Sequence, residues 1–389
     1  MFFAEKNPAI PLSLYVHIPW CIRKCPYCDF NSYGISAPGA FPESRYIAAL
    51  TADLDTSLPF VGGREIRSVF FGGGTPSLLS GEGIARLLSV IRERLSLSPS
   101  TEITLEANPG AVESGKFAVF SSAGVNRLSL GIQSFDANCL KAAGRIHDDK
   151  EAYRAVEIAA LNFPVFNLDL MYGLPRQTPE QVETDIGRAI RFSPAHLSCY
   201  QLTLEADTAF GISPPELPDA DACADMQELV EEKLAAAGYR HYEISAFARP
   251  GKECVHNLNY WTFGDYLGIG AGAHSKLTRV GQERFEIFRQ TRWRRPERYI
   301  EEALSGCAVE ESFRIVEDDL PLEFMMNALR LTEGFDVALF ETRTFLPFAR
   351  IESILAEAST KSLLKHSGGR TRPTLQGQRF LNRLLAMFA

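Results

Sequence analysis

The chain has 389 residues, 46% of them hydrophobic, so it is long enough for one large domain and a small one, each with a buried core. Its 48 acidic and 40 basic residues give a formal net charge of −8. This acidic balance argues against a general nucleic-acid-binding protein, which would carry a basic face, but a compact anionic ligand needs only a local basic patch.

No segment predicts secretion or membrane insertion. The first residues, MFFAEKNP, lack a basic region followed by an apolar run and a cleavage site. No run of about 18 uncharged apolar residues could span a membrane. Three of the eight cysteines cluster and five are scattered, unlike a disulfide-bonded secreted domain. We therefore expect a cytoplasmic protein whose scattered cysteines are free thiols, with no nucleic-acid partner.

Short β-rich segments alternate with amphipathic helices over the first 200 residues. The predicted strands cover residues 12–18, 69–71, 102–105, 127–132, 165–171 and 197–204. Among the helices, residues 84–95 carry one apolar face, and Thr178 with Gln181 forms a capping box. Six such units predict parallel strands with right-handed crossovers. An open doubly wound sheet and a full or partial barrel both fit, and both place ligands at the carboxyl ends of the strands.

The pattern changes after residue 210, and a second unit begins near residue 306. Helices are predicted at 320–331, 351–364 and 376–388, with a turn or wing marked by Gly368, Gly369 and Pro373. We therefore expect a main domain over residues 1–305 and a small winged-helix-like domain over residues 306–389.

Three cysteines follow the first predicted strand with the spacing C-x3-C-x2-C: Cys21, Cys25 and Cys28. Three thiolates within eight residues can converge on one metal centre. A closed zinc site needs a fourth ligand, and only His17 is near enough to serve. A [4Fe–4S] cluster on three thiolates keeps one iron open for an exchangeable ligand. The spacing favours this cluster over a zinc loop.

Further polar and glycine residues follow the later strands. In the segment GGGTP, at residues 72–76, glycines let a ligand approach the backbone and leave N–H groups free to donate. Glu106, Gln133, Arg145 and Asp169 follow successive strands. Carboxylates can bind hydroxyls or an amine, and arginine can bind a carboxylate. Any one of these could be an ordinary strand-end residue; their joint placement indicates a cofactor pocket.

On these motifs, with Tyr27 as the aromatic residue before the third cysteine, the sequence resembles the radical S-adenosylmethionine (radical SAM) superfamily. The resemblance implies an α/β fold, a partial (β/α)6-type barrel, and a [4Fe–4S] cluster on Cys21, Cys25 and Cys28. It also implies S-adenosyl-L-methionine on the open iron, cleaved after electron transfer to a 5′-deoxyadenosyl radical. By similarity to the oxygen-independent coproporphyrinogen III oxidases and their relatives, the expected cofactor contacts are Tyr15, Gly73, Gly74, Thr75, Glu106, Gln133, Arg145 and Asp169.

Within that group the sequence looks like the HemW-type haem chaperones. The oxidases carry a fourth cysteine two residues after the third, where this chain has Phe30. His256, Asn257, Tyr260 and Trp261 match the H-N-x-x-Y-W motif of the HemW type. The resemblance implies a protein that binds haem and delivers it to an acceptor protein, in peripheral contact with membrane haemoproteins. An oxidase-like enzyme acting on a porphyrin precursor is the alternative, and a metal-binding barrel with an unrelated substrate is a third possibility.

Haem contact by the motif has a physical basis. Imidazole is a common haem-iron ligand, and flat aromatic side chains can pack on a porphyrin. We expect His256 as the axial ligand, with Tyr260 and Trp261 beside the porphyrin and His274 as a second candidate ligand. From composition alone, a buried histidine that hydrogen-bonds to the backbone beside core aromatics is the better interpretation, and the family match is what favours haem contact.

The segment GIGAGA at residues 268–273 fits a dinucleotide-binding pattern. No clear strand precedes it, and it lies outside any complete βαβ unit. The family resemblance implies instead that it is a close-packed turn near the haem or substrate side.

Overall fold

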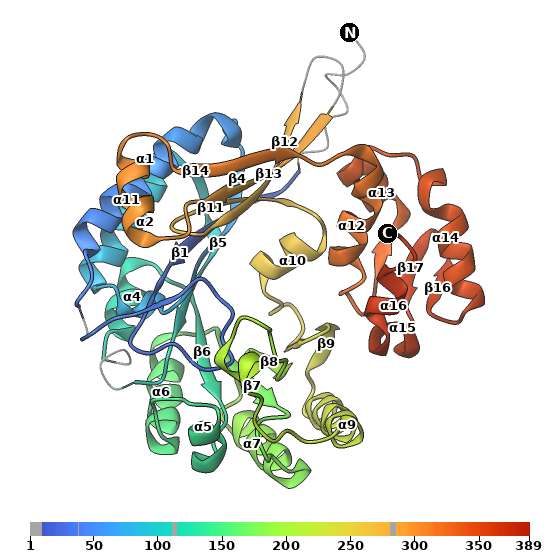
Figure 1. Cartoon of the computed structure of the whole chain (residues 1–389), viewed down its shortest axis with the longest axis horizontal. Coiled ribbons are helices and arrows are strands. Elements are labelled where there is room, and N and C mark those ends of the chain that lie inside the picture. Colours follow the sequence, from blue (N-terminus) through green and yellow to red (C-terminus); the bar gives the residue numbers. More distant parts are fainter. Residues whose placement is uncertain (1–9, 38, 111–114, 281–284) are drawn as a thin grey trace.

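One continuous twelve-stranded sheet forms the main part of the molecule (Figure 1). The computed structural model describes residues 10–37, 39–110, 115–280 and 285–389. In sheet order the strands are β14 (Val309–Arg314), β13 (Phe285–Arg292), β12 (His274–Val280), β11 (Asp265–Ile269), β1 (Leu12–Ile18), β4 (Glu65–Gly73), β5 (Ser96–Ala107), β6 (Arg127–Gln133), β7 (Phe166–Tyr172), β8 (His196–Gln201), β10 (Ala246–Ala248) and β9 (Arg240–Glu243).

The strand order decides between the two architectures that the sequence allows. Strands β1, β4, β5, β6, β7 and β8 are parallel and adjacent in chain order. A doubly wound sheet would reverse its order at a switch point, whereas an unreversed order keeps the right-handed crossovers on one face. Figure 1 shows these helices along the outer side of the strands: α1 (Glu43–Val61), α2 (Gly81–Arg94), α4 (Phe117–Ala123), α5 (Ala137–Ala142), α6 (Asp149–Asn162) and α7 (Pro179–Arg191). The predicted partial barrel is confirmed.

The barrel is open on one side. On its other side β1 pairs with β11, and β8 pairs with β10, so the sheet continues past both ends of the parallel set. Helix α10 (Val255–Trp261) contacts β1, β4 and β11 and lies near the centre of the molecule in Figure 1. Its side chains therefore reach the barrel interior. The remaining helices of this part are α8 (Ala209–Ile212), α9 (Ala220–Ala236) and α11 (Pro296–Leu304).

Local sequence explains where the outer helices start. The Ser80 hydroxyl accepts a hydrogen bond from Gly83 N and caps α2, which buries Ile84, Leu87, Leu88 and Ile91. Thr178 and Gln181 form the predicted capping box of α7. Both helices place one apolar stripe against the sheet, as their spacing predicts.

The C-terminal part has its own core and the predicted winged-helix-like form. Strands β15 (Phe335–Asp336), β17 (Arg370–Pro373) and β16 (Leu364–Ser367) form a small sheet beside α12 (Leu320–Ala328), α13 (Val337–Thr344), α14 (Ala349–Thr360), α15 (Leu375–Arg379) and α16 (Leu381–Leu385). A separate apolar cluster from Ile315 to Phe388 lies beneath it, joined by Phe263 and Ile287. Strand β14, which starts three residues after the predicted boundary at 306, still pairs with β13 of the large sheet.

Two predicted helices in this part are wrong in extent. The helix predicted at 351–364 ends at Thr360, because Ser362 takes a left-handed conformation (φ 59°) and Leu364 begins β16. The helix predicted at 376–388 is two short helices that meet at Phe380, whose φ and ψ of −112° and 39° are not helical. Tertiary pairing and a local break override the helical spacing of apolar residues there.

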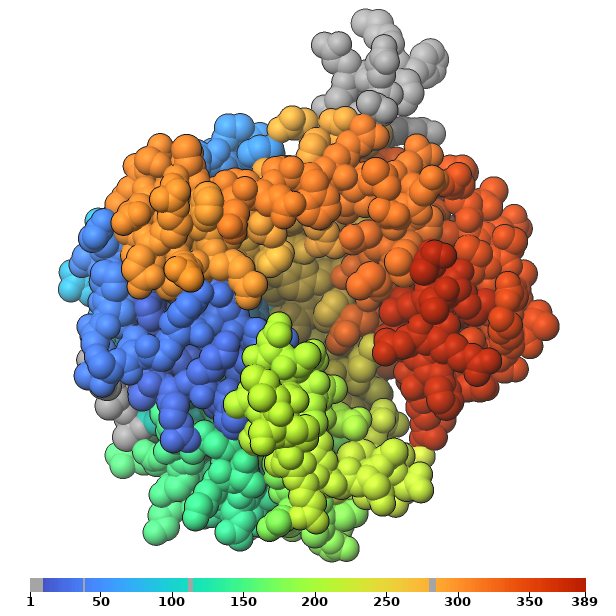
Figure 2. Space-filling view, viewed as in Figure 1, coloured from blue at the N-terminus to red at the C-terminus, as the bar shows by residue number. Residues whose placement is uncertain are grey.

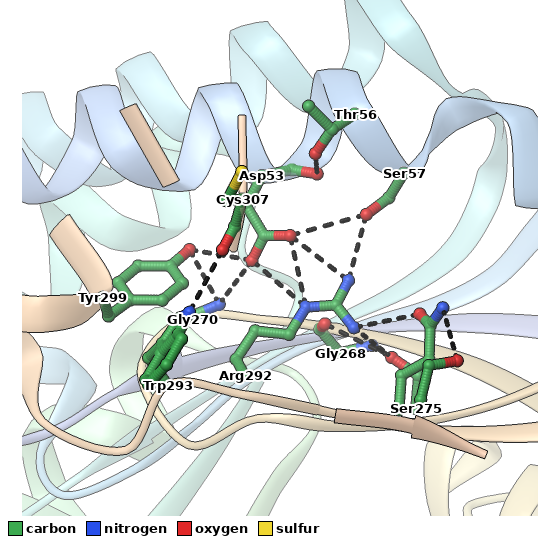
Figure 3. A network of polar contacts seen from close by, with 12 residues as sticks. Asp53, Thr56, Ser57, Gly268, Gly270, Ser275, Arg292, Trp293, Tyr299 and Cys307 are labelled. Atoms are coloured by element: carbon green, nitrogen blue, oxygen red, sulfur yellow. Dashed lines mark hydrogen bonds and ion pairs between the residues drawn. The ribbon is translucent and has the colours of Figure 1, made fainter. Parts of the chain in front are cut away.

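A buried ion pair joins α1 to β13 (Figure 3). The side chains of Asp53 and Arg292 are both fully buried, and Arg292 Nη2 lies 3.2 Å from Asp53 Oδ1. Arg292 also donates to the hydroxyls of Ser57 (3.0 Å) and Ser275 (3.1 Å). Tyr299 of α11 donates to the second oxygen of Asp53 at 2.9 Å. Each buried charge is thus surrounded by hydrogen-bond partners, the condition under which a buried pair is tolerated.

We expect Asp53→Asn to lower the free energy of unfolding by about 3–5 kcal/mol, because it leaves Arg292 as a buried charge without a counter-ion. Urea unfolding followed by circular dichroism measures this loss. Asp55→Asn is the matched control. Asp55 is in the same helix and forms a half-exposed pair with Arg94, so its loss should cost less than about 1 kcal/mol. Equal losses in the two variants would contradict the role given to Asp53.

Candidate functional site

A cavity of about 370 Å³ lies at the carboxyl ends of the parallel strands. All three clustered cysteines line it, and so do seven predicted cofactor residues: Gly73, Gly74, Thr75, Glu106, Gln133, Arg145 and Asp169. They come from the cluster loop, from the ends of β4, β5 and β6, and from β7, with Arg145 following α5. The expectation that Asp169 follows its strand is wrong, because it lies in the middle of β7. Tyr15, the eighth predicted residue, lines a second cavity that is described below.

Hydrogen-bond donors lie beside two of the thiols. The Thr75 hydroxyl donates to Cys21 Sγ at 3.4 Å, and Arg145 Nη1 donates to Cys25 Sγ at 3.3 Å. The loop that carries the cysteines is closed at its ends by pairing of β2 (Trp20–Cys21) with β3 (Tyr33–Gly34). Burial raises the pKa of Cys21 and Cys28, so their thiolates need a positive partner, which bound metal would supply.

This donor set suits a cluster better than zinc. Over the described ranges, no three His, Cys, Asp or Glu side chains surround a point where a single metal ion could bind. His17, the possible fourth zinc ligand, has both ring nitrogens engaged: Tyr15 OH lies 3.0 Å from Nδ1 and Asn31 O lies 2.8 Å from Nε2. Burial lowers the pKa of His17 to about 4, so the ring is neutral. In a [4Fe–4S] cluster each thiolate binds a separate iron, which suits sulfurs that do not meet at one point.

The glycine turn after β4 is required by packing. A Cβ on Gly73, whose φ is 114°, would lie 2.5 Å from Cε1 of His17, and a Cβ on Gly74 would lie 2.6 Å from Trp20 O. The expectation that the N–H groups of this turn are free is wrong at both positions. Gly73 N donates to Glu106 Oε2 (3.1 Å), and Gly74 N donates to Ile18 O (2.8 Å).

Two half-buried carboxyl groups, Glu106 and Asp169, form one wall of the cavity. Burial, and then the proximity of Asp169, raises the pKa of Glu106 from 4.5 to about 8. Burial also raises the pKa of Asp169, although its oxygens accept hydrogen bonds from Asn167 (2.8 Å) and Ser129 (3.0 Å). A cationic ligand would favour the ionised form of both groups. Gln133 nearby has a left-handed φ of 67°, a strained conformation of the kind found at functional sites.

A second cavity of about 180 Å³ lies against the first. The two cavities share Glu106, Ser129, Asp169 and Tyr200. Its remaining lining comes from inward-facing strand residues and from α10, which contributes three residues of the H-N-x-x-Y-W motif: His256, Asn257 and Tyr260. The motif therefore forms part of the barrel interior next to the predicted cofactor pocket.

His256 is held by two side chains. It is 1% exposed, with Nδ1 2.9 Å from Ser68 Oγ and Nε2 2.8 Å from Tyr260 OH. Burial lowers its pKa to about 3, so the ring is neutral, the form in which histidine binds iron. Iron ligation by Nε2 would require Tyr260 to give up its hydrogen bond.

The other two predicted haem residues, Trp261 and His274, do not line the second cavity. Trp261 lines neither cavity, and its ring lies 4.3 Å from the guanidinium of Arg330, which in turn pairs with Glu243 at 3.4 Å. Ile244 N also donates to Arg330 O, so Trp261 lies where the C-terminal part is attached to the barrel. His274 is exposed at the start of β12 and lines neither cavity.

The segment at 268–273 is a close-packed turn, although strand β11 does precede it, contrary to the prediction. Gly270 N donates to Asp53 Oδ2 (3.2 Å) and Tyr299 OH (3.0 Å), as Figure 3 shows. Ala271 N donates to Tyr46 OH at 2.9 Å. These backbone donors are engaged internally, and strand β12 follows in place of a helix. The turn therefore cannot bind a dinucleotide phosphate.

Sequence reasoning missed several lining residues, chiefly Asn108, Arg127, Ser129, Asn167, Ser198 and Tyr200. The period-two rule could have found some of them, since Arg127, Ser129 and Gln133 lie on one face of β6, as Asn167 and Asp169 do on β7.

The chain is similar to known proteins over most of its length. The sequence profile of the Radical SAM superfamily matches residues 15–189, and that of the HemN C-terminal domain matches residues 315–380. "Heme chaperone HemW" of Escherichia coli (strain K12) is 47% identical over 379 residues, covering 97% of this chain and 98% of that protein. The mouse protein "Radical S-adenosyl methionine domain-containing protein 1, mitochondrial" is 37% identical over 330 residues, covering 83% and 74% of the two chains.

Among solved structures, the Escherichia coli coproporphyrinogen III oxidase (HemN), a radical SAM enzyme, superposes with a TM-score of 0.81. The two chains are 25% identical, and the match covers 99% of this chain and 91% of the oxidase.

We expect Glu106→Gln to change the pH dependence of stability in the cofactor-free protein. Because folding raises the pKa of Glu106 to about 8, its contribution to stability is present below pH 4.5 and is lost as the pH rises through about 8. We compare the free energy of unfolding of the Gln variant with that of the native protein by urea unfolding. The difference should shift in favour of the variant by more than about 1 kcal/mol between about pH 5 and pH 8.5. Glu65→Gln, an exposed position on β4, is the control. Parallel pH profiles for native protein and Glu106→Gln would contradict the prediction.

Proposed function

This chain belongs to the HemW family of the radical SAM superfamily, and we propose that it is a haem chaperone that carries a [4Fe–4S] cluster and exchangeable S-adenosyl-L-methionine. The observation that carries the proposal is the wall shared by two cavities. One is lined by the three cysteines, and the other by the H-N-x-x-Y-W motif. A ligand in one cavity therefore touches residues that also line the other.

The residues of the larger cavity fit the two cofactors. Cys21, Cys25 and Cys28 would hold the cluster, with Thr75 and Arg145 donating to two of the sulfurs. When bound, the cluster supplies an open iron for the methionine end of the cofactor and an electron for its cleavage. Glu106 and Asp169 would bind the hydroxyl or amine groups of S-adenosyl-L-methionine. Its positive charge would lower the high pKa of both acids.

We place haem beside α10. Figure 2 shows a hollow between the barrel and the C-terminal part, with residues coloured as the region near 250–270 at its floor. His256 would bind the iron after Tyr260 turns away, and Tyr260 would then border the porphyrin. His274 is the second candidate ligand, and we assign Trp261 a part in holding the C-terminal domain, residues 306–389, against the main domain, residues 1–305.

Delivery requires an acceptor protein, which we propose to be a haemoprotein, including membrane haemoproteins approached from the surface. No helix in the described part of the chain is long and apolar enough to cross a membrane. Phe30 (61% exposed) and Ile146 (48% exposed) line the mouth of the larger cavity and offer an apolar contact to a partner. All eight cysteines are free thiols, which agrees with the cytoplasm as the proposed location.

The cluster is tested by anaerobic reconstitution. We expect Cys21→Ser, Cys25→Ser and Cys28→Ser each to lose the brown chromophore and most of the bound iron and sulfide, because two thiolates cannot hold the cluster. Adding S-adenosyl-L-methionine to the reduced native protein should change the cluster's EPR spectrum. Cys307→Ser, which removes an exposed thiol, is the control and should keep both properties. Full iron and sulfide in Cys21→Ser would rule out the assignment.

Haem binding is tested by an absorbance titration on the same reconstituted protein. His256→Ala should lose the Soret shift or weaken binding at least about tenfold, because the axial ligand is gone, while Tyr260→Phe frees Nε2 and should bind haem at least as tightly. A loss confined to His274→Ala would move the ligand there, and no haem binding by the native protein would refute the chaperone proposal.

Coproporphyrinogen decarboxylation should be absent, because Phe30 stands where the oxidases have a fourth cysteine. Vinyl product above a no-protein control would instead favour the oxidase.

A further inference from the structure

The second cavity contains a buried arginine that has no counter-ion at contact distance among the residues that the structure describes. Arg127, the first residue of β6, lines the cavity and is 3% exposed. Within the described ranges, no carboxylate lies within 4.0 Å of its guanidinium. The hydrogen bond that its side chain donates to Lys252 O, from Nη1, is long, at 3.4 Å. Arginine is always charged in proteins, and a buried cation without a paired anion is costly.

The acids near Arg127 are engaged elsewhere. Asp169 accepts from Asn167 and Ser129, as described above. Glu102 accepts from Val255 N (3.2 Å) and His256 N (3.1 Å) at the start of α10. Both lie close enough to raise the pKa of Arg127 against the effect of burial, but neither forms an ion pair with it. Donors of the guanidinium therefore remain for a ligand.

The hydroxyl of Thr104 is a second hydrogen-bond donor in the cavity, and it has no partner in the described part of the chain. Thr104 is completely buried, and its Oγ1 has no hydrogen-bond partner among the described residues. A buried hydroxyl in that state is destabilising unless a ligand or water satisfies it. Thr104 and Arg127 line the same cavity, from neighbouring strands β5 and β6, whose register pairs these two residues.

The size of the cavity limits what can bind. The second cavity has about half the volume of the first, about 180 Å³ against about 370 Å³. A flexible arm of about five heavy atoms that ends in a carboxylate fits there, and a carboxylate is the group that arginine binds with two parallel hydrogen bonds.

We propose that the second cavity receives one carboxylate arm of the porphyrin, with Arg127 as its ion-pair partner and Thr104 as a further donor. The proposal rests on the proposed function, and it names the chemical group by which the haem is recognised. His256, Asn257 and Tyr260 line the same cavity, so a porphyrin beside α10 has this cavity next to its edge. Recognition of the carboxylate would then be separate from ligation of the iron.

The test compares haem with haem dimethyl ester, in which both carboxylates are blocked, in absorbance titrations of the reconstituted full-length protein. The native protein should bind haem about tenfold or more tightly than the ester. Arg127→Gln should bind haem about as weakly as the ester, while its affinity for the ester stays unchanged. Arg127→Lys should restore part of the preference. Arg154→Gln, an exposed arginine of α6, is the matched control and should keep it in full.

Thr104→Val provides a second variant of similar shape that leaves the charge in place. It should weaken haem binding a few-fold and leave ester binding unchanged. Equal affinity of the native protein for haem and ester would overturn the proposal while leaving haem binding intact. Equal losses for both ligands in Arg127→Gln would also overturn it. If Arg127→Gln instead abolished the EPR change caused by S-adenosyl-L-methionine and kept the ester preference, the carboxylate bound there would belong to that cofactor.

Discussion

The buried pair of Asp53 and Arg292 joins residues 239 positions apart, and the cluster loop depends on it (Figure 3). Asp53 and its partner Tyr299 accept the N–H of Gly270, which sets the turn after β11. That turn lies against the end of β1, where a Cβ on Gly270 would be 2.4 Å from His17 O. Asn31, three residues beyond Cys28, donates to Ala271 O at 2.9 Å. The far end of the cysteine loop is thus positioned by an ion pair between α1 and β13.

Charged side chains that form no close ion pair within the described ranges dominate the electrostatics of the barrel interior. The larger cavity has two acids whose pKa values are raised by burial, and the smaller has Arg127, which forms no ion pair with another described residue. Each feature is unfavourable in the unliganded protein and is relieved by a ligand of opposite charge. Because both cavities share Glu106 and Asp169, the charge of one ligand also acts on the other. This shared wall would couple loading of the cofactor to loading of haem.

The H-N-x-x-Y-W motif has two tasks on one short helix. His256 and Tyr260 point into the barrel and hydrogen-bond to each other, while Trp261 packs under Arg330 of the C-terminal part. Neighbouring residues on a helix point to different sides, so Tyr260 and Trp261 contact different parts of the protein. The motif therefore links the barrel interior to the domain that borders the hollow in Figure 2.

The sequence by itself determined the repeating strands and helices, the cysteine loop, and the seven predicted cofactor residues that line the larger cavity with the cysteines. Each of these depends on local spacing and on the rule that parallel strands end at one edge. The sequence's pattern of strands and helices could not choose between an open sheet and a barrel, since strand order is a long-range property, and only the family resemblance favoured the barrel. Only the tertiary structure showed that Gly73 is fixed by His17, that Trp261 leaves the motif's pocket, and that Arg127 and Asp53 are buried charges. Those facts depend on contacts between residues far apart in the chain, which spacing along the sequence does not encode.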